Sequence, residues 1–195
     1  MTVETMSLFF ALLTVAANVF VVGAAILALA SRFSEGAEAA LDWLRDMVDG
    51  ASLFLAWVVA LVATLGSLYY SEVANFPPCE LCWYQRIAMY PLVVILGIAA
   101  VRRDFGVRRY VIPLVAIGAA ISVYHYQLER FPSQTSLSCA ADVPCTTVWV
   151  WRFHYISIAF MALSAFALIA ALLLLGPGSN QDAFDDEPVA GEPVG

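Results

Sequence analysis

Long runs of apolar residues, separated by short polar segments, dominate the pattern along this chain. An α-helix needs roughly 17 to 25 mostly apolar residues to cross the hydrocarbon of a bilayer. Stretches of that kind lie at residues 7–30, 53–70, 83–101, 110–127 and 153–175. The pattern therefore predicts an all-α membrane protein with five transmembrane helices.

The first apolar stretch has a second interpretation, because residues 28–30 (ALA) resemble the cleavage site of a signal peptide. A signal peptide begins with positive charge and has a shorter apolar core. Here Glu4 is the only charged side chain in residues 1–5, so the start is not positive, and the apolar stretch is longer than a signal peptide requires. We therefore expect residues 1–31 to form an uncleaved transmembrane helix.

Two segments of the chain differ from the apolar stretches. Residues 32–52 are rich in charge, yet Leu41, Leu44 and Val48 recur in them at helical spacing. This pattern is typical of an amphipathic helix at the membrane surface, although an ordinary linker helix would show it too. Residues 176–195 are rich in Gly, Pro, Asp and Glu, and this composition predicts a disordered acidic tail.

The composition agrees with a membrane protein. Hydrophobic residues make up 62% of the chain and the mean hydropathy is +0.83, whereas a soluble domain is about half apolar. The formal net charge is −7, and all nine basic residues are arginine. Nucleic-acid-binding domains carry a basic patch or stripe. The charge balance therefore argues against a nucleic-acid partner and leaves membrane lipid as the surroundings of most of the chain.

The arginines also predict the orientation, because short cytoplasmic loops of membrane proteins are enriched in Lys and Arg. The loop 102–109 contains four arginines and is therefore expected in the cytoplasm. The segment 71–82 has no basic residue, and the loop 128–152 has only Arg130 and Arg152. Both segments should lie on the extracytoplasmic face of a multi-pass cell-membrane protein, and all four cysteines fall in these two segments.

The first cysteine pair is Cys79 and Cys82, directly after the prolines at 77–78. Proline is tolerated before a helix or in its first turn, so a helix should begin near Cys79. The Cys-x-x-Cys spacing brings the two sulfurs within reach of each other at a helix N-terminus. The unpaired amides and the dipole there favour a thiolate, which is a reactive species in disulfide exchange.

Arg86 lies four residues after Cys82, on the same helical face and roughly 6 Å deeper along the axis. An ionisable residue at that depth is costly and is usually functional. It could hold the Cys82 thiolate and polarise a carbonyl of a bound oxidant. Alternatively, its guanidinium could extend to the lipid headgroups without a chemical role.

The second pair, Cys139 and Cys145, lies in the long outer loop, with Pro144 directly before Cys145. A short disulfide ring in such a loop would be accessible to thiols of another protein. By itself the pair could equally be a structural disulfide. A zinc site built from all four cysteines is a further alternative, but an oxidising face favours disulfides over metal, so we expect no metal.

Three segments resemble the disulfide bond formation protein B family (DsbB), and most closely its BdbC branch. They read PCELCWYQR at 78–86, SVYHYQ at 122–127 and CAADVPC at 139–145, followed by the last apolar stretch. The resemblance covers about residues 53–175. It implies a four-helix transmembrane bundle with redox activity, so residues 1–31 would form one extra N-terminal transmembrane helix.

The resemblance also implies an activity, protein thiol:quinone oxidoreduction with transfer of electrons to ubiquinone or menaquinone. By motif position, Cys82 would face the quinone, with Arg86 beside it. Cys79 would exchange with Cys145 of the loop pair. Cys139 would form the mixed disulfide with a soluble, extracytoplasmic, thioredoxin-like protein, which the membrane protein reoxidises.

Both histidines lie at outer helix ends. His125 matches the Tyr-His-Tyr motif of the branch, and it could donate a hydrogen bond or a proton near the quinone or merely be an interfacial histidine. His154 is expected to have no chemical role. It lies where the branch often has a glycine-phenylalanine step, which residues 152–155 (RFHY) replace here.

Two other classes of protein also have paired cysteines in a membrane protein. A quinone reductase of the vitamin K epoxide reductase kind also has four helices and paired cysteines, but its loop pair precedes the membrane Cys-x-x-Cys. Here the order is reversed. A non-catalytic membrane scaffold with structural disulfides would differ by resisting mild reductants and by never reducing quinone.

Overall fold

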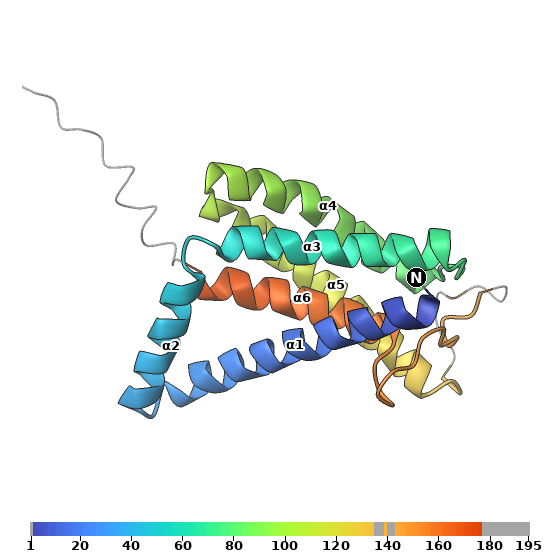
Figure 1. Ribbon diagram of the computed structural model, residues 1–195, viewed down its shortest axis with the longest axis horizontal. Helices are drawn as coiled ribbons and strands as arrows, with labels where there is room; N and C mark the ends of the chain where they lie inside the picture. The colour runs from blue at the N-terminus through green and yellow to red at the C-terminus, as the bar shows by residue number, and fades with distance from the viewer. Residues whose placement is uncertain (1, 135–138, 140–142, 177–195) are drawn as a thin grey trace, which may run out of the picture.

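The computed structural model describes residues 2–134, 139 and 143–176, and most of these residues are helical (Figure 1). The six α-helices are α1 (Val3–Ala30), α2 (Glu35–Val48), α3 (Ser52–Leu68), α4 (Glu80–Arg102), α5 (Arg108–Arg130) and α6 (Ile158–Leu175). A π-helical turn, Tyr69–Val73, extends α3, and a 3-10 turn, Phe105–Val107, precedes α5. The predicted tail at 176–195 lies outside the described residues except for Gly176.

The all-α membrane fold is confirmed. Five helical segments of the described chain are long and apolar enough to cross a membrane: Val3–Ala30, Ser52–Val73, Glu80–Arg102, Phe105–Arg130 and Ile158–Leu175. Each overlaps one of the apolar stretches found in the sequence. Of the described α-helices, only the short helix α2 is not among these candidate membrane-spanning segments.

The last spanning helix begins later than residue 153, where the apolar stretch starts. Arg152 and Ile156 form an isolated antiparallel bridge, and Phe153 and His154 between them have φ values of 50° and 64°. These left-handed conformations cannot continue into an α-helix. The helix starts only after Ser157, whose hydroxyl accepts a hydrogen bond from the Phe160 amide as an N-cap.

Helices α3 to α6 form the bundle, and most of the largest buried cluster of apolar side chains lies between them. Phe166 of α6 is fully buried and faces Gly118 of α5. A Cβ at Gly118 would come within 2.3 Å of that ring. The glycine therefore permits the close approach of α5 and α6, as small residues do in membrane helix pairs.

The amphipathic pattern of the second segment is confirmed as a helix, α2. Leu41, Leu44 and Val48 are buried and belong to the main cluster, whereas Trp43 and Met47 are exposed. Figure 1 shows α2 bridging from the end of α1 back to the start of α3. The apolar stripe thus packs on the end of the bundle that carries the arginine-rich loop.

Helix α1 lies outside the four-helix bundle, along α6 (Figure 1). Its N-terminal end lies close to the end of the bundle where α4 begins, and its other end diverges from α6 toward α2. Most of its large apolar side chains are exposed, which suits a surface covered by lipid. Its small and polar residues Ser7, Ala11, Thr14 and Ala24 are buried against the bundle.

Candidate active site

The first cysteine pair sits at the N-terminus of α4, as the sequence predicts. Cys79 is the N-cap residue, and its sulfur accepts a hydrogen bond from the Cys82 amide at 3.4 Å. Both cysteines are free thiols, with 3.0 Å between their sulfurs. The prolines at 77–78 precede the helix, so the local sequence places both sulfurs on its first turn.

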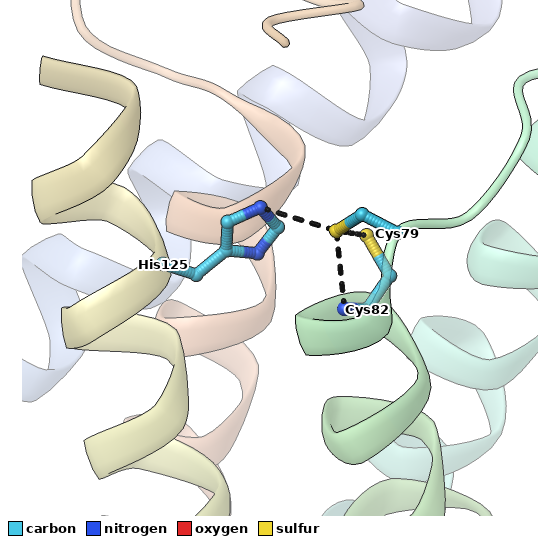
Figure 2. A group of neighbouring side chains, drawn as sticks. All are labelled: Cys79, Cys82 and His125. Carbon is cyan, nitrogen blue, oxygen red and sulfur yellow. Dashed lines mark hydrogen bonds between the residues drawn. The ribbon is translucent and has the colours of Figure 1, made fainter. Parts of the chain in front are cut away.

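His125 of α5 is the third member of the cluster, and Figure 2 shows its ring facing the Cys79 sulfur. Its Nε2 lies 3.6 Å from that sulfur, and its Nδ1 lies 3.5 Å from Oε1 of Gln85. The Gln85 amide in turn donates to the Ser122 hydroxyl at 2.9 Å. This buried chain of contacts fixes the orientation of the imidazole beside Cys79.

The surroundings of Cys79 favour its thiolate form. Its hydrogen bond with the Cys82 side chain lowers the pKa of the Cys79 thiol, and His125 lowers it further, while burial acts in the opposite direction. The amides of the first helical turn act in the same sense as the hydrogen bonds. A thiol with a lowered pKa forms a thiolate more readily, so Cys79 is well suited to act as a nucleophile or a leaving group in thiol–disulfide exchange.

Replacing His125 by alanine is expected to raise the pH midpoint for alkylation of Cys79 by about one unit or more. The imidazole stabilises the thiolate, so without it the thiol keeps its proton to higher pH. The measurement is the iodoacetamide rate at Cys79 against pH, by mass spectrometry, in the reduced protein with Cys139 and Cys145 changed to serine. His154→Ala, at an exposed histidine, should leave the midpoint in place, and an unchanged midpoint in His125→Ala would contradict this role.

The second pair forms a disulfide between Cys139 and Cys145, with 5.9 Å between the Cα atoms. Cys145 is only 1% exposed and belongs to a small buried cluster with Cys79, Leu81 and Leu128. Cys139 is partly exposed and packs on the outside of the same cluster. The loop disulfide therefore lies against the membrane pair, with Cys139 as its more accessible sulfur.

Arg86 is held inside the bundle. Its Nε donates to the Ser67 hydroxyl and its Nη2 to the Ser67 carbonyl, both at 3.0 Å, and its guanidinium lies 5.3 Å from the Trp83 ring centre. Ser67 belongs to α3, so the arginine links α3 to α4 one turn below Cys82. This contact argues against a guanidinium that merely extends toward the headgroups.

Cys82 and Arg86 line a cavity of about 540 Å³ between α1, α3, α4 and α6. Gln85 and Ser67 lie at the same end, which is also lined by an aromatic stack of Tyr70, Phe76 and Trp149. The remaining walls are almost entirely apolar. The volume lies within the range of roughly 300–1,000 Å³ found for small-molecule sites. His125 is not among the lining residues, because it lies on the far side of Cys79.

The alternative of a zinc site built from all four cysteines meets an obstacle. Cys79, Cys82 and His125 place three ligand atoms within 4.8 Å of one another, a set that could hold a metal ion. A site with four sulfurs would also need Cys139 and Cys145, which are joined in the loop disulfide. The arrangement therefore supports thiol–disulfide exchange better than the four-cysteine zinc site.

Reasoning from the sequence gave no role to Glu129, one helical turn after His125. Its carboxylate is 8% exposed and accepts a hydrogen bond from Ser157, the N-cap residue of α6. An acid at the end of an apolar stretch is usually a surface residue. Its spacing of four from His125, which puts both on one helical face, was the available signal.

These features define a membrane thiol–disulfide oxidoreductase: a helical bundle whose reactive Cys-x-x-Cys lies between a loop disulfide and an apolar cavity. A match to a known protein family agrees with this class. Residues 50–176 match the family described as "Disulfide bond formation protein DsbB". The chain belongs to this family and is a disulfide-forming membrane protein. The match begins after α2, so α1 lies outside it.

Individual relatives have names of the same kind. "Disulfide bond formation protein C" of Bacillus subtilis (strain 168) is 49% identical over 131 residues, which are 67% of this chain and 95% of that protein. A "Probable disulfide formation protein" of Deinococcus radiodurans is 50% identical over 131 residues, 62% of this chain and 85% of that protein. No solved structure matches the chain.

Proposed function

We propose that this protein is a thiol:quinone oxidoreductase that reoxidises a soluble thioredoxin-like protein and passes the electrons to ubiquinone or menaquinone. One observation carries the proposal. Both cysteines of the membrane pair pack at the buried cluster that contains Cys145 of the loop disulfide, but only Cys82 of the two also lines the apolar cavity, together with Arg86. A pair that contacts the loop disulfide and also reaches the cavity is suited to relay electrons from a protein substrate to a small-molecule oxidant.

The relay begins at the loop pair. A thiolate of the soluble partner attacks Cys139, which forms the mixed disulfide and releases the Cys145 thiolate. Cys145 then attacks Cys79 in the oxidised membrane pair, and Cys82 leaves as a thiolate. The second partner thiol attacks the mixed disulfide, so the partner departs oxidised and Cys139 is freed. Cys139 then attacks Cys145, which restores the loop disulfide and releases Cys79 as a thiolate.

The membrane pair is then reduced, and its two electrons leave through the cavity. A bound quinone supplies this oxidation: it takes up two electrons and two protons and becomes a quinol while Cys79 and Cys82 become a disulfide. Cys82 would react with a quinone ring held in the cavity, because its side chain lines it, and Arg86 would supply a positive charge to stabilise the reduced oxygens. The apolar walls suit a lipid-soluble oxidant and keep water away.

The reaction requires the cysteines to face an oxidising compartment, so we place them on the extracytoplasmic side. The loop disulfide packs at the start of α4, whereas the arginine-rich segment 102–109 follows the other end of that helix. Because arginine-rich loops stay in the cytoplasm, the cysteine end lies outside. In this proposal residues 53–175 are the redox unit.

Arg86→Ala is expected to raise the KM for quinone about tenfold or more, because among the described residues Arg86 is the one cation that lines the cavity. The KM for the soluble partner should change little, since the loop disulfide is untouched. Steady-state quinone reduction measures both constants. Arg102→Ala, at the opposite end of α4, is the matched control. Unchanged quinone kinetics in Arg86→Ala would mean that the arginine only ties α4 to α3.

A further inference from the structure

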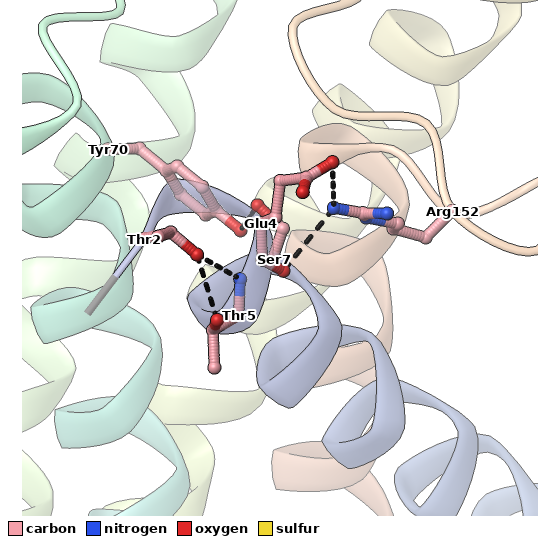
Figure 3. A network of polar contacts seen from close by, with 6 residues as sticks. All are labelled: Thr2, Glu4, Thr5, Ser7, Tyr70 and Arg152. Atoms are coloured by element: carbon pink, nitrogen blue, oxygen red, sulfur yellow. Dashed lines mark hydrogen bonds and ion pairs between the residues drawn. The ribbon is translucent and has the colours of Figure 1, made fainter.

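Two contacts at its N-terminal end fix helix α1 to the cysteine end of the bundle (Figure 3). The Tyr70 hydroxyl donates to the Ser7 hydroxyl at 3.2 Å, and both side chains are buried. Arg152 donates to the Glu4 carbonyl at 3.3 Å and lies 3.7 Å from the Glu4 carboxylate. Tyr70 belongs to the π-helical turn that extends α3, and Arg152 belongs to the segment before α6, so α1 is joined to two parts of the redox unit.

A third contact lies deep in the spanning region. The Asn18 amide donates to the Ser164 hydroxyl of α6 at 2.7 Å and to the Thr14 carbonyl at 2.8 Å. An amide in hydrocarbon needs such partners, and a hydrogen bond between membrane helices holds them in one register. The three contacts together keep one face of α1 turned toward the bundle.

That face forms one wall of the cavity that contains Cys82 and Arg86. The residues of α1 that line it recur at helical spacing and are Phe10, Leu13, Thr14, Ala16, Ala17 and Phe20. The Phe10 ring lies against Gly66 of α3, where an added Cβ would meet it at 3.0 Å. Helix α1 therefore covers one side of a cavity that the four-helix bundle alone would leave more open to lipid.

The lining of the cavity extends along α6. Its lining on α6 runs from Ile158 to Leu172, and a rise of 1.5 Å per residue makes this wall about 21 Å long. The thiol and the guanidinium lie near the end at Ile158, whereas Leu55, Phe20 and Leu172 mark an apolar far end. This shape fits a molecule with one reactive polar head and a long flexible apolar tail.

We propose that α1 and α6 form a channel for the polyisoprenoid tail of the quinone, with α1 selecting long-tailed quinones; this rests on the proposed function. The channel opens directly onto the Cys82 sulfur, which favours an occupant that carries the group this sulfur reduces. A phospholipid acyl chain would fit the apolar part but has no oxidising head.

The first test compares a tail-less quinone with one carrying the same ring and four isoprene units, in detergent, for the full chain. Ala17→Phe, which fills the channel from α1, should raise the ratio of the KM for the tailed quinone to that for the tail-less one at least tenfold. Ala25→Phe, at an exposed position of α1 outside the cavity lining, should leave the ratio as in wild type. An unchanged ratio in Ala17→Phe would overturn the channel.

The second test does not depend on turnover. A quinone with a photoreactive group at the tail end should label peptides of α1 that contain residues 10–20. Excess unlabelled long-tailed quinone should remove the labelling, and excess phosphatidylglycerol vesicles should not. Labelling absent from α1, or removed equally by the phospholipid, would overturn the proposal. If wild type reduced neither quinone, the proposed function would fail, and the labelling would still decide whether the channel binds the tail.

Discussion

Cys82→Ser is expected to lose quinone reduction by roughly 10³-fold or more, because the sulfur that faces the cavity carries the electrons out of the protein. Serine has nearly the same size, so the helix start and the contacts of Cys79 should persist. Without Cys82 the membrane pair cannot form its own disulfide, so the Cys79 thiolate attacks Cys145 of the loop disulfide, forms a Cys79–Cys145 bond and releases the Cys139 thiolate. Non-reducing peptide mapping should therefore find a Cys79–Cys145 disulfide that wild type does not accumulate.

The control for Cys82→Ser is Tyr84→Phe, two residues along the same helix at an exposed position outside the cavity lining. It should reduce quinone at the wild-type rate. Full turnover in Cys82→Ser would contradict the assignment of the exit sulfur. A lost activity without the Cys79–Cys145 disulfide would contradict the order of the relay.

Cys145→Ser is expected to abolish oxidation of the soluble partner, again by roughly 10³-fold or more, while quinone reduction driven by dithiothreitol remains measurable. The variant lacks the loop disulfide that accepts the partner's electrons. The membrane pair and the cavity stay intact, so a small dithiol that reaches Cys79 can still feed electrons to quinone. This separation distinguishes Cys145→Ser from Cys82→Ser, which should lose both activities.

The measurement for Cys145→Ser is quinol formation with each reductant, side by side. Thr146→Ser, at the neighbouring position, is the matched control and should retain both activities. If Cys145→Ser oxidised the partner at the wild-type rate, the loop pair would have no part in the relay. The partner's thiols would then react directly with Cys79.

The helices could be predicted well because hydrocarbon demands continuous apolar runs, and the five runs became five spanning segments. The start of α6 could not be predicted from hydropathy. Phe153, His154 and Tyr155 are as compatible with a membrane interface as with a helix, and only the left-handed backbone at the first two shows that the chain turns there. The amphipathic stripe on α2 predicted a helix but not that its leucines would join the core.

The site was predictable in its sulfur chemistry and less so in its neighbours. The prolines before Cys79 correctly placed the pair at a helix start. The sequence offered His125 a place near the quinone, whereas its contact in the structure is the Cys79 sulfur, which depends on how α5 packs on α4. Contacts between helices distant in sequence, such as Arg86 with Ser67 and α1 with the cavity, leave no periodic signal along the chain.

The central claim is that electrons pass from partner thiols through both cysteine pairs to a quinone. The most direct test is an anaerobic single turnover of the purified full chain with a reduced thioredoxin-like protein and a stoichiometric amount of quinone. The account predicts one quinol formed for each partner disulfide, at matching rates. Partner oxidation without quinol, or no reaction with either ubiquinone or menaquinone, would contradict it.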